Sequence, residues 1–206
     1  MMTPAAPQVR RTQAERSAAT IENLRSAAVD SLVEVGYART STQDICRRAG
    51  VSQGALFRHF PSRLAFMIAV ADYIGIQLVV HFSTRFRALE QQQPTDLIGL
   101  ALNLARENTR SPLQHAWAEL LMAARSDQEL RESLQPIWAK NQQAIKQEAR
   151  RLLPALVERI PDFDTAVEVI TMFYQGEAIN HVMNPLLSGD ERRTAWVGGL
   201  LRDMAG

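Results

Sequence analysis

The residue types that could catalyse a reaction or bind a metal are few in this chain and far apart. The four histidines, His59, His81, His115 and His181, form no His-x-x-x-His or His-Glu-x-x-His pair, and Cys46 is the single cysteine. Such local pairs are what many zinc sites and zinc hydrolases carry in their sequences. The chain also contains no glycine-rich phosphate loop and no Gly-x-Ser-x-Gly elbow. The sequence therefore predicts no catalytic site, no metal site and no cofactor.

The side chains that could still bind a partner do so by hydrogen bonds and charge. They are concentrated in AGVSQGALFRHFPSR, residues 49–63. Hydroxyl side chains at 40–42 are expected to cap a short helix, QDICRRA, that ends at Gly50. Ser52 is expected to cap a second short helix, QGALFRHF, that ends at Pro61. Two short helices joined by a glycine turn are typical of the helix-turn-helix, whose second helix enters the major groove of DNA. The same spacing also fits a small three-helix core with a solvated basic edge.

Positive charge is concentrated in the same third of the chain, although the net charge of the whole chain is only +1. Residues 1–63 contain nine arginines and five acidic residues, a net +4, whereas the remainder has 14 basic and 17 acidic residues, a net −3. A basic segment on a mildly acidic chain favours binding to nucleic acid, because each neutralised phosphate releases condensed counterions.

Cap signals and apolar residues at steps of three and four divide the rest of the chain into helices. The expected elements are a helix over 17–36 ended by Gly36, one over 63–90 capped by Ser62, one opened by Thr95, one opened by Ser111 and Pro112, one from the Ser126 and Glu129 capping box to Leu153, one from Asp162 to Leu187, and a last one capped by Ser188. Pro136 is expected to kink or split the long helix that contains it, because proline removes a backbone donor. No segment alternates like a strand, so the expected fold class is all-α with about nine helices.

Composition favours a soluble protein of the cytosol. The 206 residues are 46% hydrophobic and 22% charged, which is enough to bury a sizeable core. The first twenty residues lack the apolar segment of a secretory signal, and no uninterrupted run of roughly 18 apolar residues predicts a membrane span. A single cysteine permits no internal disulfide, and Cys46 is expected to be a small buried packing residue, with a redox-active thiol as the alternative.

The segment TSTQDICRRAGVSQGALFRHFPSR, residues 40–63, resembles the signature of the tetracycline-repressor (TetR) family of bacterial regulators. That signature runs approximately T-[TV]-x-x-I-A-x-x-A-G-V-S-x-G-x-[LI]-Y-x-H-F-x-[ST]-K. The resemblance implies a helix-turn-helix DNA-binding domain over 17–62. It implies a larger helical domain over 63–206 that binds an effector and dimerises. The basic residues before the DNA-binding domain, 1–16, are expected to form a disordered tail.

The function implied by the resemblance is sequence-specific regulation of transcription in the bacterial cytoplasm, with the protein on the nucleoid when it occupies its operator. The simplest form is a homodimeric repressor that a small apolar or amphipathic effector releases from a pseudo-palindromic operator in double-stranded DNA. An activator would use the same contacts. A helical adaptor whose helix-turn-helix no longer binds DNA is the alternative outside this class. The operator sequence, the regulated genes and the effector cannot be read from the chain.

The resemblance assigns the outer face of the second short helix to the bases of DNA. Ser52 is expected to cap this recognition helix, while Gln53, Gly54 and Ala55 approach base edges. A glutamine can pair with N6 and N7 of adenine. Phe57 stands where the family usually has tyrosine, so contact with a thymine methyl is the role left to its ring.

The same comparison assigns other side chains to the phosphates, which fix register without reading sequence. Thr42, His59 and Arg63 resemble phosphate contacts, and Arg58 suits either role. Arg63 replaces the usual lysine and offers a forked guanidinium. The tail, with its arginines, is a candidate for the adjacent minor groove.

Apolar residues of the larger domain provide candidates for two further sites. Large side chains on the helices that enclose the pocket in similar proteins are the effector candidates: Trp117, Leu121, Met122, Trp138, Met172 and Phe173. Apolar residues on the last two helices are the dimer candidates: Ile179, Val182, Met183, Trp196, Val197 and Leu200. Core packing within one subunit is the alternative for both sets.

Overall fold

The computed structural model describes residues 12–183 and 189–205 of the chain. These residues form ten helices and no strand: α1 (Gln13–Arg39), α2 (Thr42–Ala49), α3 (Gln53–His59), α4 (Arg63–Glu90), α5 (Leu97–Thr109), α6 (Pro112–Ala124), α7 (Gln128–Leu152), α8 (Pro154–Val157), α9 (Phe163–Met183) and α10 (Asp190–Ala205). The predicted all-α fold class is confirmed. The helix beyond the expected nine is α8, a single turn that directly follows α7.

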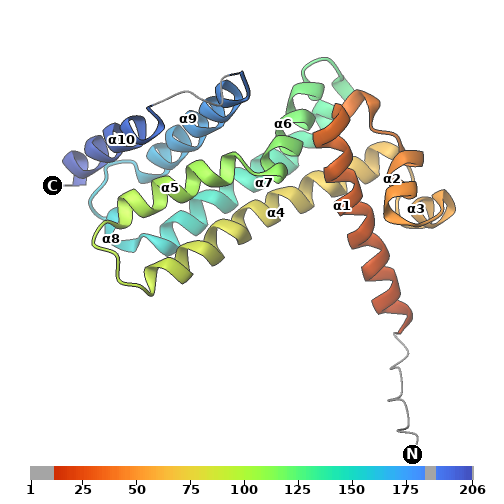
Figure 1. The fold of residues 1–206 in the computed structure, drawn as a ribbon, viewed down its shortest axis with the longest axis horizontal. Helices are drawn as coiled ribbons and strands as arrows, with labels where there is room; N and C mark the ends of the chain where they lie inside the picture. The colour runs from red at the N-terminus through yellow and green to blue at the C-terminus, as the bar shows by residue number, and fades with distance from the viewer. Residues whose placement is uncertain (1–11, 184–188, 206) are drawn as a thin grey trace, which may run out of the picture.

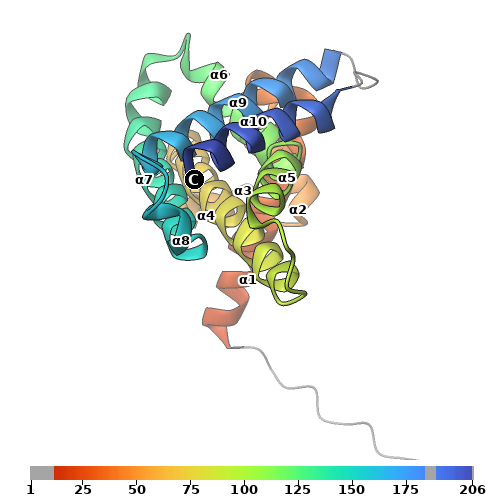
Figure 2. The same ribbon diagram turned by 90° about the vertical axis from the view of Figure 1, so that its left-hand side faces the viewer.

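The helices form an elongated molecule, with α1, α2 and α3 at one end and the pair α9 and α10 at the other (Figure 1). The long helix α4 joins the two ends and packs against α5, α6 and α7. Turned by 90°, the structure shows α9 and α10 running antiparallel over α5 (Figure 2). Helix α4 therefore connects the two ends of the molecule without a break.

Helix α1 begins earlier than the sequence analysis predicts. Thr12 and Glu15 form a capping box, in which Thr12 Oγ1 accepts from Glu15 N at 3.2 Å and Thr12 N donates to Glu15 Oε2 at 2.7 Å. Residues 13–16, assigned above to the tail, are thus helical, whereas residues 1–11 lie outside the described residues. Near the other end, Gly36 has φ 75° and ψ 170°, a conformation that favours glycine and that kinks α1 where the sequence predicts its end, three residues before Arg39.

The short helices have the caps that the sequence predicts. Ser41, Ser52 and Ser62 cap α2, α3 and α4, each through its hydroxyl oxygen. Gly50 lies between α2 and α3 with φ 67°, a conformation that glycine adopts at little cost. These local signals fix the turn angle and thereby the orientation of α3.

The DNA-binding end and the larger domain share one hydrophobic core. Leu32 of α1 and Leu56 of α3 are fully buried in the same cluster as Phe66 of α4 and Trp117 of α6. Helix α6 packs along α1. The predicted border between residues 62 and 63 therefore marks the start of α4 without separating two cores.

The caps of the middle helices are partly as predicted. Ser111 caps α6, whose first residue is proline, as the sequence indicates. The predictions for the other two are wrong by one residue, because Asp96 rather than Thr95 caps α5 and Asp127 rather than Ser126 caps α7. In both cases the carboxylate next to the hydroxyl accepts the backbone hydrogen bond, at 2.9 Å and 3.0 Å. A charged acceptor makes the stronger bond to an amide.

Proline does not divide α7 in the way that the sequence predicts. The helix continues from Gln128 to Leu152 with Pro136 inside it, so the expected split is absent. Pro136 is exposed, and its ring therefore displaces no packed side chain. Asp162 directly precedes α9, as predicted, whereas the predicted helix end at Leu187 and the cap at Ser188 lie outside the described residues.

Helix α4 is long and apolar enough to cross a membrane by length and composition alone. The sequence analysis counts only uninterrupted apolar runs and therefore does not predict such a segment. In the structure, one side of α4 is buried in protein. Phe66, Val70 and Ile74 are fully buried in the shared core, and Phe86 is buried in a second cluster with α5 and α7 residues. Ile76 and Val80 of the same helix are exposed.

Candidate nucleic-acid interface and ligand cavity

One side of α3 is anchored in the core. Leu56 is fully buried, and Phe60, the C-cap residue, packs on Phe66 with ring centroids 5.0 Å apart. Ala49 and Val51 pack against the same cluster from the turn. Because these side chains pack inward, the opposite side of α3 is fixed in direction.

The other side of α3 faces solvent. The exposed residues are Gln53, Gly54, Phe57 and Arg58, whereas Ala55 and His59 are half-buried. The Phe57 side chain is 45% exposed, although phenyl rings gain free energy when they are buried. The face therefore combines an amide, a guanidinium and an uncovered aromatic ring within two helical turns.

The packing of the described chain does not require glycine at position 54. A Cβ at Gly54 would meet only Ser52 Oγ, at 3.8 Å. Glycine inside a helix costs about 1 kcal/mol relative to alanine. Because glycine has no side chain, another molecule can approach the backbone of α3 closely at this position. Ser52 itself acts as the predicted cap, its Oγ accepting from Ala55 N at 3.2 Å.

Arg63 holds the end of α1 against the start of α4. Its guanidinium donates to Tyr37 O at 2.8 Å and to Thr40 O at 3.1 Å and 3.3 Å, and lies 4.2 Å from the centroid of the Tyr37 ring. The half-buried side chain thus satisfies carbonyls at the C-terminus of α1. This clamp is a role that the sequence analysis missed, and the expected contact with phosphate stays a prediction.

Two arginines of α2 are engaged in ion pairs. Arg48 contacts Asp44 at 2.6 Å and Glu34 of α1 at 2.7 Å, and Arg47 also pairs with Asp44. The two guanidinium groups lower the pKa of the Asp44 carboxyl. Part of the positive charge counted in the sequence is therefore neutralised locally. Thr42, the first residue of α2, is half-buried beside them.

Comparison with known proteins identifies the family to which this chain belongs. A family model described as bacterial regulatory proteins, tetR family, matches residues 24–70. The uncharacterized HTH-type transcriptional regulator Rv2912c of Mycobacterium tuberculosis is 34% identical over 193 residues, which cover 93% of this chain and 97% of that protein. The chain belongs to the TetR family. TetR-family proteins are DNA-binding transcription regulators with a helix-turn-helix, and they are not enzymes.

Other relatives agree with this assignment. The HTH-type transcriptional regulator CymR of Pseudomonas putida is 31% identical over 165 residues, which cover 80% of this chain and 79% of that protein. Among solved structures, a transcriptional regulator from Rhodococcus sp. Rha1 aligns with a TM-score of 0.68 at 22% identity, covering 89% of this chain and 95% of that one. A TetR transcription regulator from Haloarcula marismortui aligns with a TM-score of 0.64 at 17% identity, covering 91% and 97%. The two structures share the TetR fold with this chain.

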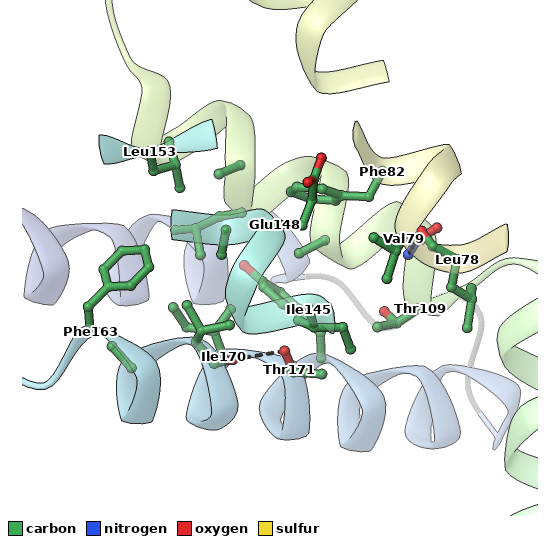
Figure 3. Close-up of a pocket in the computed structure, with 18 of the residues that line it drawn as sticks. Leu78, Val79, Phe82, Thr109, Ile145, Glu148, Leu153, Phe163, Ile170 and Thr171 are labelled. Atoms are coloured by element: carbon green, nitrogen blue, oxygen red, sulfur yellow. Dashed lines mark hydrogen bonds between the residues drawn. The ribbon is translucent and has the colours of Figure 1, made fainter. Parts of the chain in front are cut away.

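The larger domain encloses a cavity of about 150 Å³ between α4, α5, α7 and α9, with single residues from α6 and α10. Figure 3 shows Ile170 and Thr171 of α9 on one side, with Ile145 and Glu148 of α7 and Phe82 of α4 above them. Leu153 and Phe163 lie at one end, and Leu78 with Thr109 lies at the other. Most lining side chains are apolar, as in many small-molecule sites.

None of the six residues predicted for the effector pocket lines this cavity. Three of them pack in the interior elsewhere. Trp117 is 1% exposed in the core shared with α1, and Leu121 packs against that core. Phe173 packs edge-on against Tyr174 with ring centroids 5.2 Å apart. These side chains fill space, which is why they do not border a void.

The other three lie on the outer surface. Met122, Trp138 and Met172 are exposed large apolar residues on α6, α7 and α9. Neither Trp138 nor the neighbouring Pro136 is among the residues that line this cavity. Apolar type at a helical position predicts burial on average and does not tell which face of a helix borders a cavity.

The predicted dimer residues form exposed apolar faces on α9 and α10. Ile179, Val182, Met183, Trp196 and Leu200 are exposed, whereas Val197 is half-buried against the core. Trp196 is 68% exposed, and Val169 and Met172 extend the face of α9 at helical spacing. A Cβ at Gly176 or Gly199 would meet nothing within 4 Å. Within the described chain, these side chains form an apolar surface that is open to solvent.

A buried ion cluster positions these two helices. The Glu177 carboxylate accepts from Arg110 at 2.7 Å and from Arg193 at 3.0 Å, and its side chain is only 6% exposed. The cluster ties α9 to α10 and to the turn between α5 and α6. The sequence analysis missed it because Glu177 and Arg110 are 67 residues apart and no local pattern joins them.

Proposed function

We propose that this TetR-family protein is a homodimeric repressor that binds a pseudo-palindromic operator and is released when a small apolar or amphipathic molecule enters the cavity. The observation that carries the proposal is the outer face of α3, where Gln53, Phe57 and Arg58 are exposed opposite the buried Leu56. The protein would act in the bacterial cytoplasm and occupy the nucleoid when bound to its operator.

The exposed face of α3 has the groups that reading a major groove requires. The Gln53 amide can pair with N6 and N7 of adenine, and the Phe57 ring can cover a thymine methyl. Gly54 and Ala55 leave the helix surface low enough for the bases to approach. Thr42, His59 and Arg63 are proposed as phosphate contacts, Arg58 as a contact to either phosphate or base, and Ser52 as the cap that holds the helix.

Dimerisation through α9 and α10 would bring two copies of α3 to one operator. A two-fold dimer matches a palindromic site whose half-sites are one helical turn, about 34 Å, apart. The exposed apolar faces of α9 and α10 support this assembly, because contiguous apolar patches on soluble proteins mark interaction surfaces. Pairing these faces with their copies would remove Val182, Met183 and Trp196 from water.

Release by an effector follows from the position of the cavity. Leu78, Val79 and Phe82 of α4 are part of its wall, and the N-terminal residue of the same helix, Arg63, grips the end of α1. A ligand that binds better when α4 has shifted would favour the shifted state and thereby change the spacing of the two α3 helices. Operator affinity that stays constant with the cavity occupied would contradict this mechanism.

The first experiment is selection of bound duplexes from a random DNA pool at moderate salt. We expect the unchanged protein to enrich a pseudo-palindrome with half-sites one turn apart. Gln53→Ala should relax the preference at one position in each half-site by roughly tenfold, the typical value of a lost base contact. The matched control is Gln147→Ala, an exposed glutamine of α7, which should leave the selected sequence unchanged.

Two outcomes would contradict the proposal. If the full chain enriches no sequence, the helix-turn-helix does not read DNA and the adaptor alternative gains support. If in vitro transcription from a promoter that carries the selected operator rises when the protein is added, the protein is an activator. A repressor should lower transcript yield in proportion to operator occupancy.

A further inference from the structure

A few polar groups lie in the wall of the cavity, and they indicate what it can bind. Thr109 lies beside Leu78 at one end (Figure 3), and Asn108 donates to Leu78 O at 3.2 Å. The polar lining residues other than Glu148 are Asn108, Thr109, Gln114, Asn141, Thr171, Tyr174 and Gln175. The opposite end, at Leu153 and Phe163, is apolar. A molecule that fills the space must therefore be apolar over most of its length.

One polar side chain in this wall lacks a partner. Asn141 of α7 is 6% exposed, and its Oδ1 accepts no hydrogen bond from the described residues. The carboxamide lies against α4 at Gly75, where a Cβ would be 3.0 Å from Oδ1 and would leave no room for it. A buried polar atom without a hydrogen bond is destabilising and calls for a bound partner. Because a carboxamide presents both a donor and an acceptor, it can meet either kind of group on a ligand.

The charges around the cavity argue for a neutral ligand. Among the described lining residues there is no lysine, arginine or histidine, so a carboxylate or phosphate would be buried without a counter-charge. The single acidic lining residue, Glu148, is already paired with Arg151 and, at 3.7 Å, with Arg87. These arginines lower the pKa of the Glu148 carboxyl, so it remains charged and engaged at neutral pH. A cationic ligand thus finds no free acceptor charge.

The volume limits the size of the ligand. A cavity of about 150 Å³ equals the engineered apolar cavity that holds one benzene molecule. A ligand of roughly six to nine non-hydrogen atoms therefore matches the space in this conformation.

We propose that the cavity binds an uncharged, mainly apolar molecule of this size, whose single hydroxyl, carbonyl or amide group forms a hydrogen bond with Asn141. The inference rests on the proposed effector role of the cavity and specifies the ligand class. Asn141 is then the specificity-determining residue.

The test is calorimetric titration of the full chain at pH 7 with four probes of matched size: benzyl alcohol, toluene, benzoate and benzylamine. We expect benzyl alcohol to bind roughly fivefold more tightly than toluene, the value of one neutral hydrogen bond. Benzoate and benzylamine should bind more than about 100-fold more weakly than benzyl alcohol, because each would bury an unpaired charge.

The variant Asn141→Leu replaces the carboxamide by an apolar side chain of similar shape. It should lose roughly fivefold in affinity for benzyl alcohol and none for toluene. The matched control is Asn103→Leu, an exposed asparagine of α5 outside the cavity, which should change neither affinity. If Asn141→Leu does not fold, the order of the four probes on the unchanged protein still decides the question.

Three results would overturn the inference: equal affinity of the unchanged protein for toluene and benzyl alcohol, benzoate or benzylamine binding as tightly as benzyl alcohol, and no binding of any probe. Operator selection is measured separately, without probes. If it fails while benzyl alcohol shows the expected dependence on Asn141, the repressor proposal is wrong and the ligand class stands. If the operator is selected and no probe binds, the inference about the ligand is wrong and DNA binding stands.

Discussion

Replacement of Arg63 distinguishes a clamp between helices from a contact with DNA. Its guanidinium donates to carbonyls of Tyr37 and Thr40 and stacks on the Tyr37 ring, at the negative end of the α1 dipole. A hydrogen bond that involves a charged group contributes about 1.5–3 kcal/mol. Because these bonds share one half-buried guanidinium and do not add fully, Arg63→Ala should lower the free energy of unfolding by about 2 kcal/mol.

Lysine at the same position separates charge from geometry. Arg63→Lys keeps the positive charge but cannot bond two carbonyls with a planar fork while stacking on Tyr37. We expect Arg63→Lys to recover about half of this loss, so that the free energy of unfolding is lowered by only about 1 kcal/mol. A phosphate contact, in contrast, would accept lysine almost as well, since the TetR signature itself carries lysine there.

The assay is urea denaturation without DNA at one fixed protein concentration, followed by tryptophan fluorescence, because Trp117 lies in the shared core. Arg58→Ala is the matched control, since Arg58 is exposed on α3 and should change stability by less than about 0.5 kcal/mol. The salt dependence of operator binding is measured in parallel. Unchanged stability of Arg63→Ala, together with a slope of log K against log salt that is smaller by about 0.9, would refute the clamp and establish a phosphate contact.

Two further predictions concern assembly and pH. Trp196→Glu should convert the dimer to monomers in sedimentation equilibrium, because Trp196 is 68% exposed on the proposed interface. The control Trp138→Glu, on the outer surface of α7, should remain dimeric. A dimeric Trp196→Glu protein would refute this interface. Because Arg47 and Arg48 lower the pKa of Asp44, its stabilising effect is complete above the unfolded pKa of roughly 4 and is lost as pH falls through the lower folded value. As pH falls below the unfolded value, stability measured by denaturation should therefore fall less steeply in Asp44→Asn than in the unchanged protein. Equal slopes would show that the ion pairs of Asp44 do not contribute.

Local patterns predicted the helices and most of their ends, since caps depend on neighbours in sequence. Ser52 and Ser62 act as caps because each hydroxyl stands next to the first turn with no hydroxyl or carboxylate beside it in the sequence. Ser41 caps α2 although Thr40 and Thr42 flank it. The predictions missed where two acceptors are adjacent, as at Thr95 and Asp96, because the choice depends on backbone geometry. The capping box of α1 was readable from the sequence, since a threonine is followed three residues later by glutamate, but the basic composition of the tail obscured it.

The candidate sites show the limit of sequence reasoning more clearly. The family signature placed Gln53 and Arg58 on a face that the structure exposes, because that signature is local. Periodicity could not distinguish Trp117, which fills the core, from Trp138, which lies on the surface, since both are tryptophans at helical apolar positions. The wall of a cavity depends on which side chains fail to fill a space between distant helices, as around Asn141. Such packing is a property of the whole fold.

Besides α4, helix α6 also extends from the cavity to α1, on which the DNA-binding end is built. Gln114, near the start of α6, lines the cavity, and Trp117, one turn later, is buried in the core shared with α1. Glu119 of the same helix accepts from Tyr37 N at 3.4 Å, and Tyr37 O accepts from Arg63 at 2.8 Å. If the proposed effector displaces α6, the displacement would act on Tyr37 of α1, whose carbonyl accepts from Arg63 at the start of α4. The proposed release mechanism can therefore reach α1 through α6 as well as through α4, and α3 packs on α1.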